Sequence, residues 1–176
     1  MKILLHICCA PCAIFPAQLL RHEGMDVMGY FYRNNIHPYR ECVRRQETLA
    51  SYAESIDLRV IYQEGYDMEE FIRNVAFRES ERCTYCYHER LGSVARTAKR
   101  GKFDFFTTTL LYSKFQKHDM IKSIGESVGK VVGVPFYYRD FRADWTAGVE
   151  ESKSLGMYRQ QYCGCIYSEK ERYFKP

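Results

Sequence analysis

Near its amino terminus the chain reads Leu4-Leu5-His6-Ile7-Cys8-Cys9-Ala10-Pro11-Cys12, an apolar run that passes directly into a dense group of cysteines. Residues 2–7 have the composition of a buried strand, and residues 12–22 show a helical pattern that ends just before Gly24. The cysteines therefore belong to a turn between a strand and a helix. In open parallel α/β sheets, ligands bind beyond the carboxyl ends of the strands, so this turn is the expected place for an active site.

The rest of the chain repeats the alternation of short apolar runs with helical patterns. Further strands are predicted at residues 26–32, 57–63, 103–108 and 136–138, and further helices at residues 39–56, 68–75, 84–100, 117–128 and 145–155. Alternating strands and helices build a parallel sheet, so we predict an α/β fold, a Rossmann-like parallel sheet with helices on both faces. The 176 residues suit a single domain, residues 1–176, because two ordinary enzyme domains need more length.

The composition excludes a disordered chain and says little about the partner. Hydrophobic residues make up 46% and charged residues 27%, and 26 Lys and Arg against 22 Asp and Glu give a net charge of +4. Mild basicity permits a polyanionic partner without requiring one. No run approaches the ~20 apolar residues of a membrane span, and His6, Pro11 and Pro16 interrupt a signal peptide. We therefore expect a cytoplasmic protein with no membrane partner, whose clustered thiols stay reduced and serve metal or redox chemistry.

Seven of the eight cysteines fall into three tight groups. The groups are Cys8-Cys9-x-x-Cys12, Cys83-x-x-Cys86 and Cys163-x-Cys165. The eighth cysteine, Cys42, lies alone in the helix predicted at residues 39–56. We interpret Cys42 as a small buried hydrophobic residue, which is the common role of an isolated cysteine.

Three kinds of thiol chemistry are compatible with these groups. One is a thioredoxin-like dithiol, which Cys9-Ala10-Pro11-Cys12 resembles because it lies at a helix start, where the helix amides favour a thiolate. This interpretation leaves the other clustered cysteines unexplained. The two later pairs suffice for a structural zinc site, although they lie far apart in the sequence. An iron–sulfur cluster also takes four thiolates, and seven clustered thiols then leave three for a second metal or a redox pair. The spacing favours iron–sulfur over zinc.

Longer segments, taken in order along the chain, carry a resemblance to a known family. They are Leu4-Leu5-His6-Ile7-Cys8-Cys9-Ala10-Pro11-Cys12, Gly29-Tyr30-Phe31-Tyr32, Asn35-Ile36-His37-Pro38-Tyr39, Arg82-Cys83-x-x-Cys86, Asp104-x-Phe106-Thr107-Thr108-Thr109-Leu110, Arg139-Asp140-Phe141 and Tyr158-Arg159-Gln160-x-Tyr162-Cys163-Gly164-Cys165-Ile166-Tyr167-Ser168. These segments resemble those of the cobalamin-independent epoxyqueuosine reductases. The resemblance covers almost the whole chain, up to the tail from Glu169, and departs at Arg33-Asn34, where the family carries Asn-Pro.

The resemblance implies a nucleotide alpha-hydrolase-like relative of the Rossmann fold, with the cysteine turn where relatives place a phosphate loop. It implies the final step of queuosine synthesis, a two-electron reduction of the epoxide of epoxyqueuosine at the tRNA wobble position, with loss of water. It further implies a [4Fe–4S] cluster, an additional mononuclear iron or zinc, a tRNA anticodon loop as partner and an external one-electron donor of the ferredoxin or flavodoxin kind. The metal ligands would be Cys8, Cys9, Cys12, Cys83, Cys86, Cys163 and Cys165.

Asp140 is the predicted catalytic residue, because it follows the last predicted strand, where active-site residues gather. Its carboxyl group could protonate the leaving oxygen or complete the metal site. The alternative interpretation is a surface carboxylate paired with Arg139 or Arg142.

Four residues are predicted to contact the substrate, because a loop base is recognised when it is splayed out against aromatic, arginine or polar side chains. They are Asn35, His37, Arg159 and Gln160. His37 is also compatible with a turn before Pro38. Basic residues of the helix predicted at 84–100 and of the tail either contact phosphates or form a solvated face. These residues are Arg90, Arg96, Lys99, Arg100, Lys170, Arg172 and Lys175.

Overall fold

The computed structural model describes residues 1–175, with every side chain among them except that of Asp144. Four parallel strands form the sheet, in the order β3-β2-β1-β4. They are β1 (Lys2–Ile7), β2 (Asp26–Phe31), β3 (Val60–Tyr62) and β4 (Phe105–Thr108). The strand order reverses at β1, so the switch point of the sheet lies between the carboxyl ends of β1 and β4, where Cys8 and Thr109 follow.

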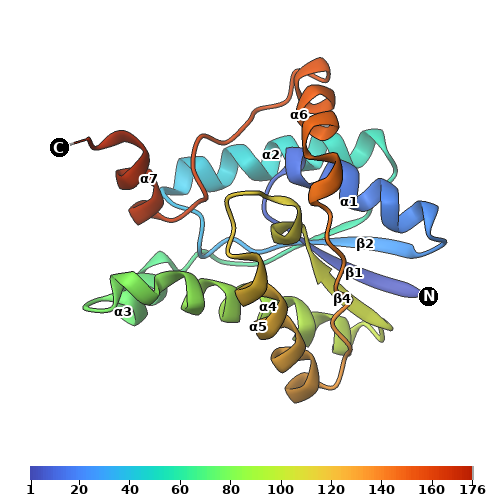
Figure 1. The fold of residues 1–176 in the computed structure, drawn as a ribbon, viewed down its shortest axis with the longest axis horizontal. Coiled ribbons are helices and arrows are strands. Elements are labelled where there is room, and N and C mark those ends of the chain that lie inside the picture. Colours follow the sequence, from blue (N-terminus) through green and yellow to red (C-terminus); the bar gives the residue numbers. More distant parts are fainter. Residues whose placement is uncertain (176) are drawn as a thin grey trace.

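Helices cover both faces of this sheet, as the alternating pattern predicts. The α-helices are α1 (Ala10–His22), α2 (Tyr39–Ser55), α3 (Met68–Val75), α4 (Arg82–Arg100), α5 (His118–Val132), α6 (Trp145–Ser154) and α7 (Ile166–Tyr173). Short 3₁₀ turns lie at Glu79–Glu81, Thr109–Tyr112 and Arg142–Asp144. In Figure 1, α1, α2 and α6 lie on one side of the sheet, α4 and α5 lie on the other, and α7 lies near the carboxyl ends of the strands. The predicted Rossmann-like parallel sheet is therefore confirmed.

Burial on both faces explains why β1 is apolar without alternation. Ile3, Leu4, Leu5 and Ile7 have no exposed surface, because β1 is paired on both edges and α1 and α4 pack against it from either side. His6 is equally buried, and its Nδ1 lies 2.8 Å from Thr108 Oγ1 on β4. The strand thus leads rigidly into the cysteine turn.

The structure corrects the strand predicted at residues 136–138. Phe136 forms only an isolated parallel bridge with Phe106, and the sheet of the described residues has four strands. Two backbone hydrogen bonds mark this contact, from Phe106 N to Pro135 O and from Tyr137 N to Phe106 O. The segment then leaves the sheet for α5, where the Tyr138 hydroxyl lies 3.1 Å from His118 Nε2.

Helix boundaries near the cysteines also differ from the prediction. The first helix begins at Ala10 rather than at residue 12, which places Cys12 in its first turn. α7 is absent from the sequence-based prediction because none of its residues is buried, so no apolar periodicity marks it. Within residues 1–175, no helix is both long and apolar enough to cross a membrane.

Gly29 in the middle of β2 supplies a test of the packing. A Cβ at this position would lie 2.8 Å from Ile7 Cδ1 and 2.9 Å from Val60 Cγ2, which is closer than side chains approach. We expect Gly29→Ala to lower the free energy of unfolding by about 1–3 kcal/mol, the usual cost of overpacking. Urea denaturation measures this change, and an unaltered midpoint would show that β1 and β3 are packed less closely around β2 than described.

Candidate metal centre and adjoining cavity

The thiols of Cys8, Cys9 and Cys12, here called the turn thiols, form a compact buried group. Their Sγ atoms all lie within 4.8 Å of one another. Cys9 occupies the N-cap of α1, so the free amides of the first helical turn face this group and favour negative charge there. Thr109 adds to the site, because its hydroxyl donates to Cys8 Sγ (3.4 Å) while its Oγ1 accepts from the Cys8 amide (3.2 Å).

The turn thiols share protons in a way that suits metal binding. Hydrogen bonds from Cys12 and Cys9 hold the pKa of Cys8 well below its usual range, whereas burial raises the pKa of Cys9. Hydrogen bonding to Cys8 also raises the pKa of Cys12. One thiolate is thus stabilised by two neighbouring thiols, and a divalent cation would take the place of their protons, because metals bind thiolates.

A second set, Cys83, Cys86, Cys163 and Cys165, is assembled from distant parts of the chain and is called the interhelix thiols here. Cys83 and Cys86 lie in the first turns of α4, and Cys163 and Cys165 lie just before α7. Desolvation, together with the neighbouring Cys86 and Cys165 thiols, raises the pKa of Cys163 to about 11. Burial raises the pKa of Cys83, and the nearby Cys86 and Cys165 thiols also raise it. These four thiols are therefore close enough to influence one another.

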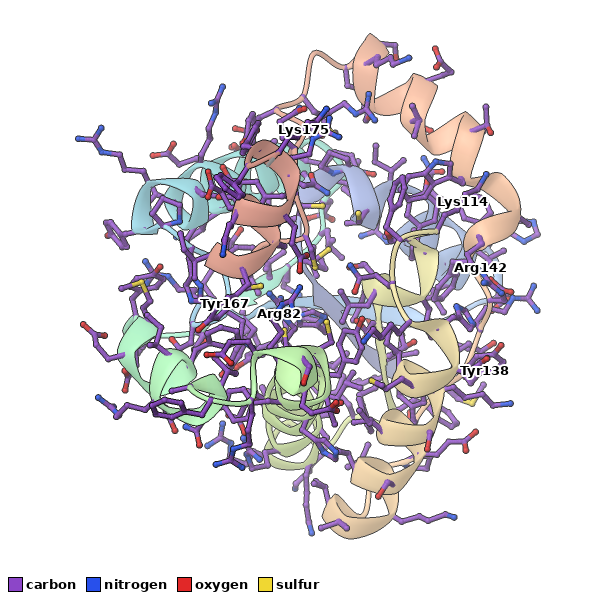
Figure 2. All side chains as sticks on the ribbon, turned by 60° about the vertical axis from the view of Figure 1, so that its left-hand side comes forward. Arg82, Lys114, Tyr138, Arg142, Tyr167 and Lys175 are labelled. Atoms are coloured by element: carbon purple, nitrogen blue, oxygen red, sulfur yellow. The ribbon has the colours of Figure 1, made fainter. Side chains whose placement is uncertain are left out.

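Contacts between α4 and α7 close this set from the outside. Arg82 forms an ion pair with Glu171, and its guanidinium lies 5.7 Å from the centre of the Tyr167 ring. Figure 2 shows Arg82 and Tyr167 side by side next to sulfur atoms, whereas Tyr138 and Arg142 lie toward the edge of the molecule. The two helices thus meet over the interhelix thiols.

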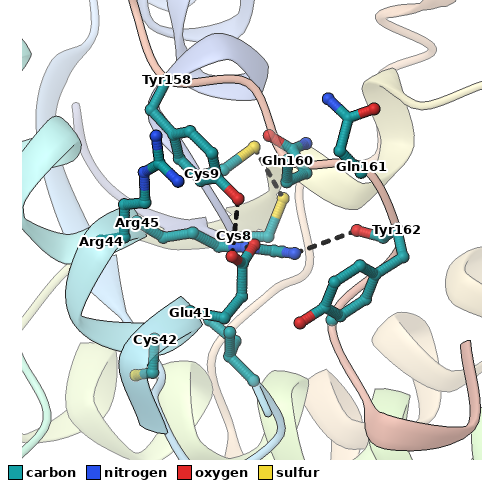
Figure 3. Close-up of polar contacts among 12 residues, drawn as sticks. Cys8, Cys9, Glu41, Cys42, Arg44, Arg45, Tyr158, Gln160, Gln161 and Tyr162 are labelled. Carbon is teal, nitrogen blue, oxygen red and sulfur yellow. Dashed lines mark hydrogen bonds and ion pairs between the residues drawn. The ribbon is translucent and has the colours of Figure 1, made fainter. Parts of the chain in front are cut away.

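The buried Arg45 holds the segment that brings Cys163 and Cys165 to α4. Its Nε donates to Glu41 Oε1 (2.7 Å), and its two terminal nitrogens donate to the carbonyl oxygens of Cys163 and Tyr162 (3.0 Å each) (Figure 3). The other carboxylate oxygen of Glu41 accepts from the Tyr158 hydroxyl at 2.6 Å. One arginine on α2 therefore fixes the segment from Tyr158 to Cys163.

Gly164 is required between the last two cysteines. It has a φ of +152°, and an added Cβ would lie 3.3 Å from Asn35 O and 3.4 Å from Arg45 Nη1. His37 supports the same segment, because its Nδ1 accepts from the Ile166 amide at 3.2 Å. The close approach of this backbone to α2 thus depends on a residue without a side chain.

A cavity of about 420 Å³ adjoins both sets of thiols. Its lining includes Cys8 and Cys12 on one side, Cys163 on another, and the side chains of Arg159, Gln160, Gln161, Tyr112, Phe115 and Trp145. Gln160 Nε2 lies 3.6 Å from Cys12 Sγ. Phe115 is 85% exposed, and its ring centre lies 5.9 Å from that of Trp145 in an edge-to-face arrangement. The cavity therefore has thiols on one side and an exposed aromatic surface on another.

The structure places the predicted substrate residues in two different environments. Arg159 and Gln160 line the cavity. Asn35 and His37 are buried beneath the cysteine segment, where Asn35 Nδ2 donates to Cys86 Sγ (3.2 Å) and His37 Nε2 lies 2.7 Å from Asn34 O. The alternative for His37, a structural residue before Pro38, agrees with these contacts.

Asp140 lies outside the cavity and is not brought to the thiols. Its carboxylate is bound by Arg142, whose side-chain nitrogens lie 2.9 and 2.6 Å from the two carboxylate oxygens. The hydrogen bonds from Arg142 lower the pKa of Asp140 to about 2, so the carboxyl group is ionised near neutral pH. This environment matches the alternative of a surface ion pair, and the catalytic role of Asp140 stays a prediction.

Three residues near the thiols were not assigned to the site from the sequence. The sequence offers Arg90 as a phosphate contact or as part of a solvated face, but it is only 2% exposed and its Nε donates to Cys86 Sγ, so both interpretations are wrong. Arg45 follows Cys42 by three residues and precedes Leu49 by four, a spacing that places an arginine on the apolar face of α2 and could have revealed it. Phe115 carries no such signal, because it belongs to an irregular loop. Cys42 itself is fully buried, as predicted for a packing residue.

Comparison with solved structures defines the class of fold. The chain superposes on the U34-tRNA thiolase NcsA from Methanococcus maripaludis, determined with its [4Fe–4S] cluster, with a TM-score of 0.65 at 14% identity, covering 96% of this chain and 61% of that one. A predicted subunit of a tRNA methyltransferase from Methanocaldococcus jannaschii gives a TM-score of 0.55 at 10% identity, covering 86% of this chain and 74% of that one. The chain therefore shares its fold with these two proteins, as the predicted Rossmann-like α/β sheet leads us to expect.

Sequence comparison then defines the family. The family model described as epoxyqueuosine reductase QueH matches residues 3–171. A protein named epoxyqueuosine reductase QueH from Dehalococcoides mccartyi is 37% identical over 175 residues, which span 99% of this chain and 96% of that protein. The protein of the same name from Thermotoga maritima is 35% identical, covering 97% of this chain and 91% of its own length. The chain belongs to the epoxyqueuosine reductase QueH family.

The Arg45 contacts lead to a stability prediction. Arg45→Ala leaves the Glu41 carboxylate, which is only 10% exposed, without its positively charged partner and with only the Tyr158 hydroxyl bound to it. Breaking such a buried pair typically costs about 3–5 kcal/mol, so we expect a loss of that order in the free energy of unfolding, measured by urea denaturation. Arg40→Ala, an exposed arginine on the same helix, is the control and should stay within about 0.5 kcal/mol. Equal effects of the two substitutions would contradict the role of Arg45.

Proposed function

We propose that this chain reduces the epoxide of epoxyqueuosine at the wobble position of tRNA to the alkene of queuosine. The balanced reaction consumes two electrons and two protons, breaks both carbon–oxygen bonds of the epoxide and releases its oxygen as water. Membership of the QueH family supports this proposal. The single structural observation that carries it is a cavity of about 420 Å³ that borders both sets of thiols.

The residues present fit two different metal groups. The turn thiols converge within 4.8 Å, as the ligands of one ion do. The interhelix thiols are not part of any such compact group among the described residues, and a cubane binds each thiolate to a different iron, which needs wider spacing. We propose that the interhelix thiols hold a [4Fe–4S] cluster and that the turn thiols hold a mononuclear iron or zinc.

The protein's own residues position the substrate next to these thiols. When bound, the metal centre would supply electrons one at a time and stabilise negative charge on oxygen. Gln160 and Arg159 offer hydrogen-bond donors at the thiol side of the cavity, and Phe115 and Trp145 offer aromatic surface for a base. A base that leaves the anticodon stack is recognised by this combination of stacking and polar contacts.

The surface near the cavity supports the remaining partners that we propose. Arg172 of α7 lines the cavity, so phosphates of an anticodon loop could pair with the tail, as considered from the sequence. Cys163 is an exposed residue whose thiol is nevertheless desolvated, so a cluster held there would lie just beneath the surface that an external one-electron donor of the ferredoxin or flavodoxin kind would approach. We place the reaction in the cytoplasm, where thiols stay reduced.

Turnover of modified tRNA tests the proposed function directly. Protein reconstituted anaerobically with iron and sulfide is supplied with a chemical reductant and tRNA that carries epoxyqueuosine. Nucleoside mass spectrometry should then show loss of one oxygen atom from the modified base. A fully loaded protein that leaves the epoxide intact would exclude this function.

The metal content tests how the thiols are divided. Reconstituted wild-type protein should contain more iron than the acid-labile sulfide of one cubane accounts for. Cys12→Ala should lose only this excess iron, whereas Cys86→Ala should lose both iron and sulfide together. Cys42→Ala is the matched control, because Cys42 lies outside both sets, and it should keep both. A colourless wild-type protein that holds only zinc would refute this division.

Removing the exposed aromatic ring should weaken binding of the substrate. Stacking contributes ~1–3 kcal/mol per base, so Phe115→Ala should raise the KM for tRNA by roughly 5-fold to 150-fold with a smaller change in kcat. Phe77→Ala is the control, since Phe77 is 99% exposed but does not line the cavity. Steady-state kinetics with both variants measure this difference in KM. Equal KM values for Phe115→Ala and Phe77→Ala would show that Phe115 makes no contact with the base.

A further inference from the structure

Arg90 places a buried positive charge at the interhelix thiols. It is 2% exposed, and its Nε donates to Cys86 Sγ at 3.2 Å. Its Nη2 donates to Asn35 O at 3.1 Å, and its Nη1 lies 3.3 Å from His6 Nε2. The guanidinium is therefore held on three sides by α4, β1 and the chain that follows β2.

The contact of Arg90 with His6 orients the guanidinium without balancing its charge. His6 is fully buried, and its Nε2 accepts a hydrogen bond from Arg90 Nη1, because a guanidinium can only donate. Nδ1–H then donates to Thr108 Oγ1 at 2.8 Å. This contact orients Arg90 and provides no negative charge to balance it.

Cysteine thiols, which become thiolates when they bind a metal, are the groups that would balance Arg90. Among residues 1–175, no carboxylate forms an ion pair with it. Its guanidinium instead faces a thiol, because Nε donates directly to Cys86 Sγ. A buried, unpaired guanidinium is costly, so its presence here indicates that the centre is designed to hold excess negative charge.

Asn35 reinforces the contact of Arg90 with Cys86. Its Nδ2 donates to Cys86 Sγ at 3.2 Å, and the residue is 1% exposed. Cys86 therefore accepts hydrogen bonds from two buried donors. Donors to a cluster thiolate, and a positive charge in a medium of low dielectric constant, stabilise the more negative, reduced cluster and so raise its reduction potential.

We propose that Arg90 and Asn35 are positioning residues that raise the reduction potential of the cluster through their hydrogen bonds to Cys86. This inference rests on the proposed function, because it requires a cluster on the interhelix thiols. It assigns to Asn35 a role at the metal centre in place of substrate contact. It also explains why an arginine occupies the apolar face of α4 between Tyr87 and Leu91, which are both buried.

A redox titration of reconstituted protein, followed by electron paramagnetic resonance, tests this inference. Arg90→Lys removes the Nε donor but retains a positive charge, and Asn35→Ala removes the second donor. At the midpoint potential of the wild-type protein, each variant should show a roughly tenfold lower ratio of reduced to oxidised cluster, which is about 59 mV for one electron. Arg96→Lys, an exposed arginine on the same helix, should leave the midpoint unchanged.

The outcomes separate this inference from the proposed function. A purely structural Arg90 would reduce the iron content of Arg90→Lys but leave the midpoint of the loaded fraction unchanged, which would overturn the inference alone. If Arg90→Lys does not take up a cluster, the midpoint of Asn35→Ala decides in its place. Wild-type protein without any reducible cluster would overturn both the inference and the proposed function.

Discussion

Arg45 on α2 donates hydrogen bonds to Glu41 and to the carbonyl oxygens of Tyr162 and Cys163, and the assembly of the centre depends on these bonds. The four interhelix thiols come from two segments that are far apart in the sequence. The sheet positions only the turn thiols and, through α4, one pair of the others. The second pair reaches the centre because a buried ion pair fixes the backbone before it, and because Gly164 allows that backbone to approach α2 closely.

Two buried arginines, Arg45 and Arg90, place positive charge at the centre. Arg45 is balanced by Glu41, whereas Arg90 is balanced by thiols, and both are at most 2% exposed. Burying a guanidinium in a site without negative charge would be strongly unfavourable. Together with the helix amides at the turn thiols, these arginines form a pocket that favours thiolates. Thiolates are the ligands that iron and zinc require, so this pocket suits the metal centre that we propose.

Much of this centre could be predicted from the sequence, because β1 and the cysteine turn follow simple periodic patterns. The clustered cysteines and the parallel sheet needed no tertiary information. Asn35 and Arg90 could be noticed as polar residues, but only the packing of α4 against the segment after β2 shows that both contact Cys86. The strand predicted at residues 136–138 is wrong, because apolar composition does not reveal that the pairing with β4 stops after one bridge. The sequence does not predict α7, because none of its residues is buried and no apolar periodicity marks the helix.

The division of the thiols into two metal sites can be observed directly by anomalous diffraction at the iron edge, from crystals of anaerobically loaded protein. We predict the density of an iron cluster between the first turns of α4 and the segment from Cys163 to Cys165. A separate metal peak should lie among Cys8, Cys9 and Cys12, and that peak should be iron if the sample was loaded with iron alone. A single metal ion shared by cysteines of both sets, with no cluster density, would contradict this division and the function built on it.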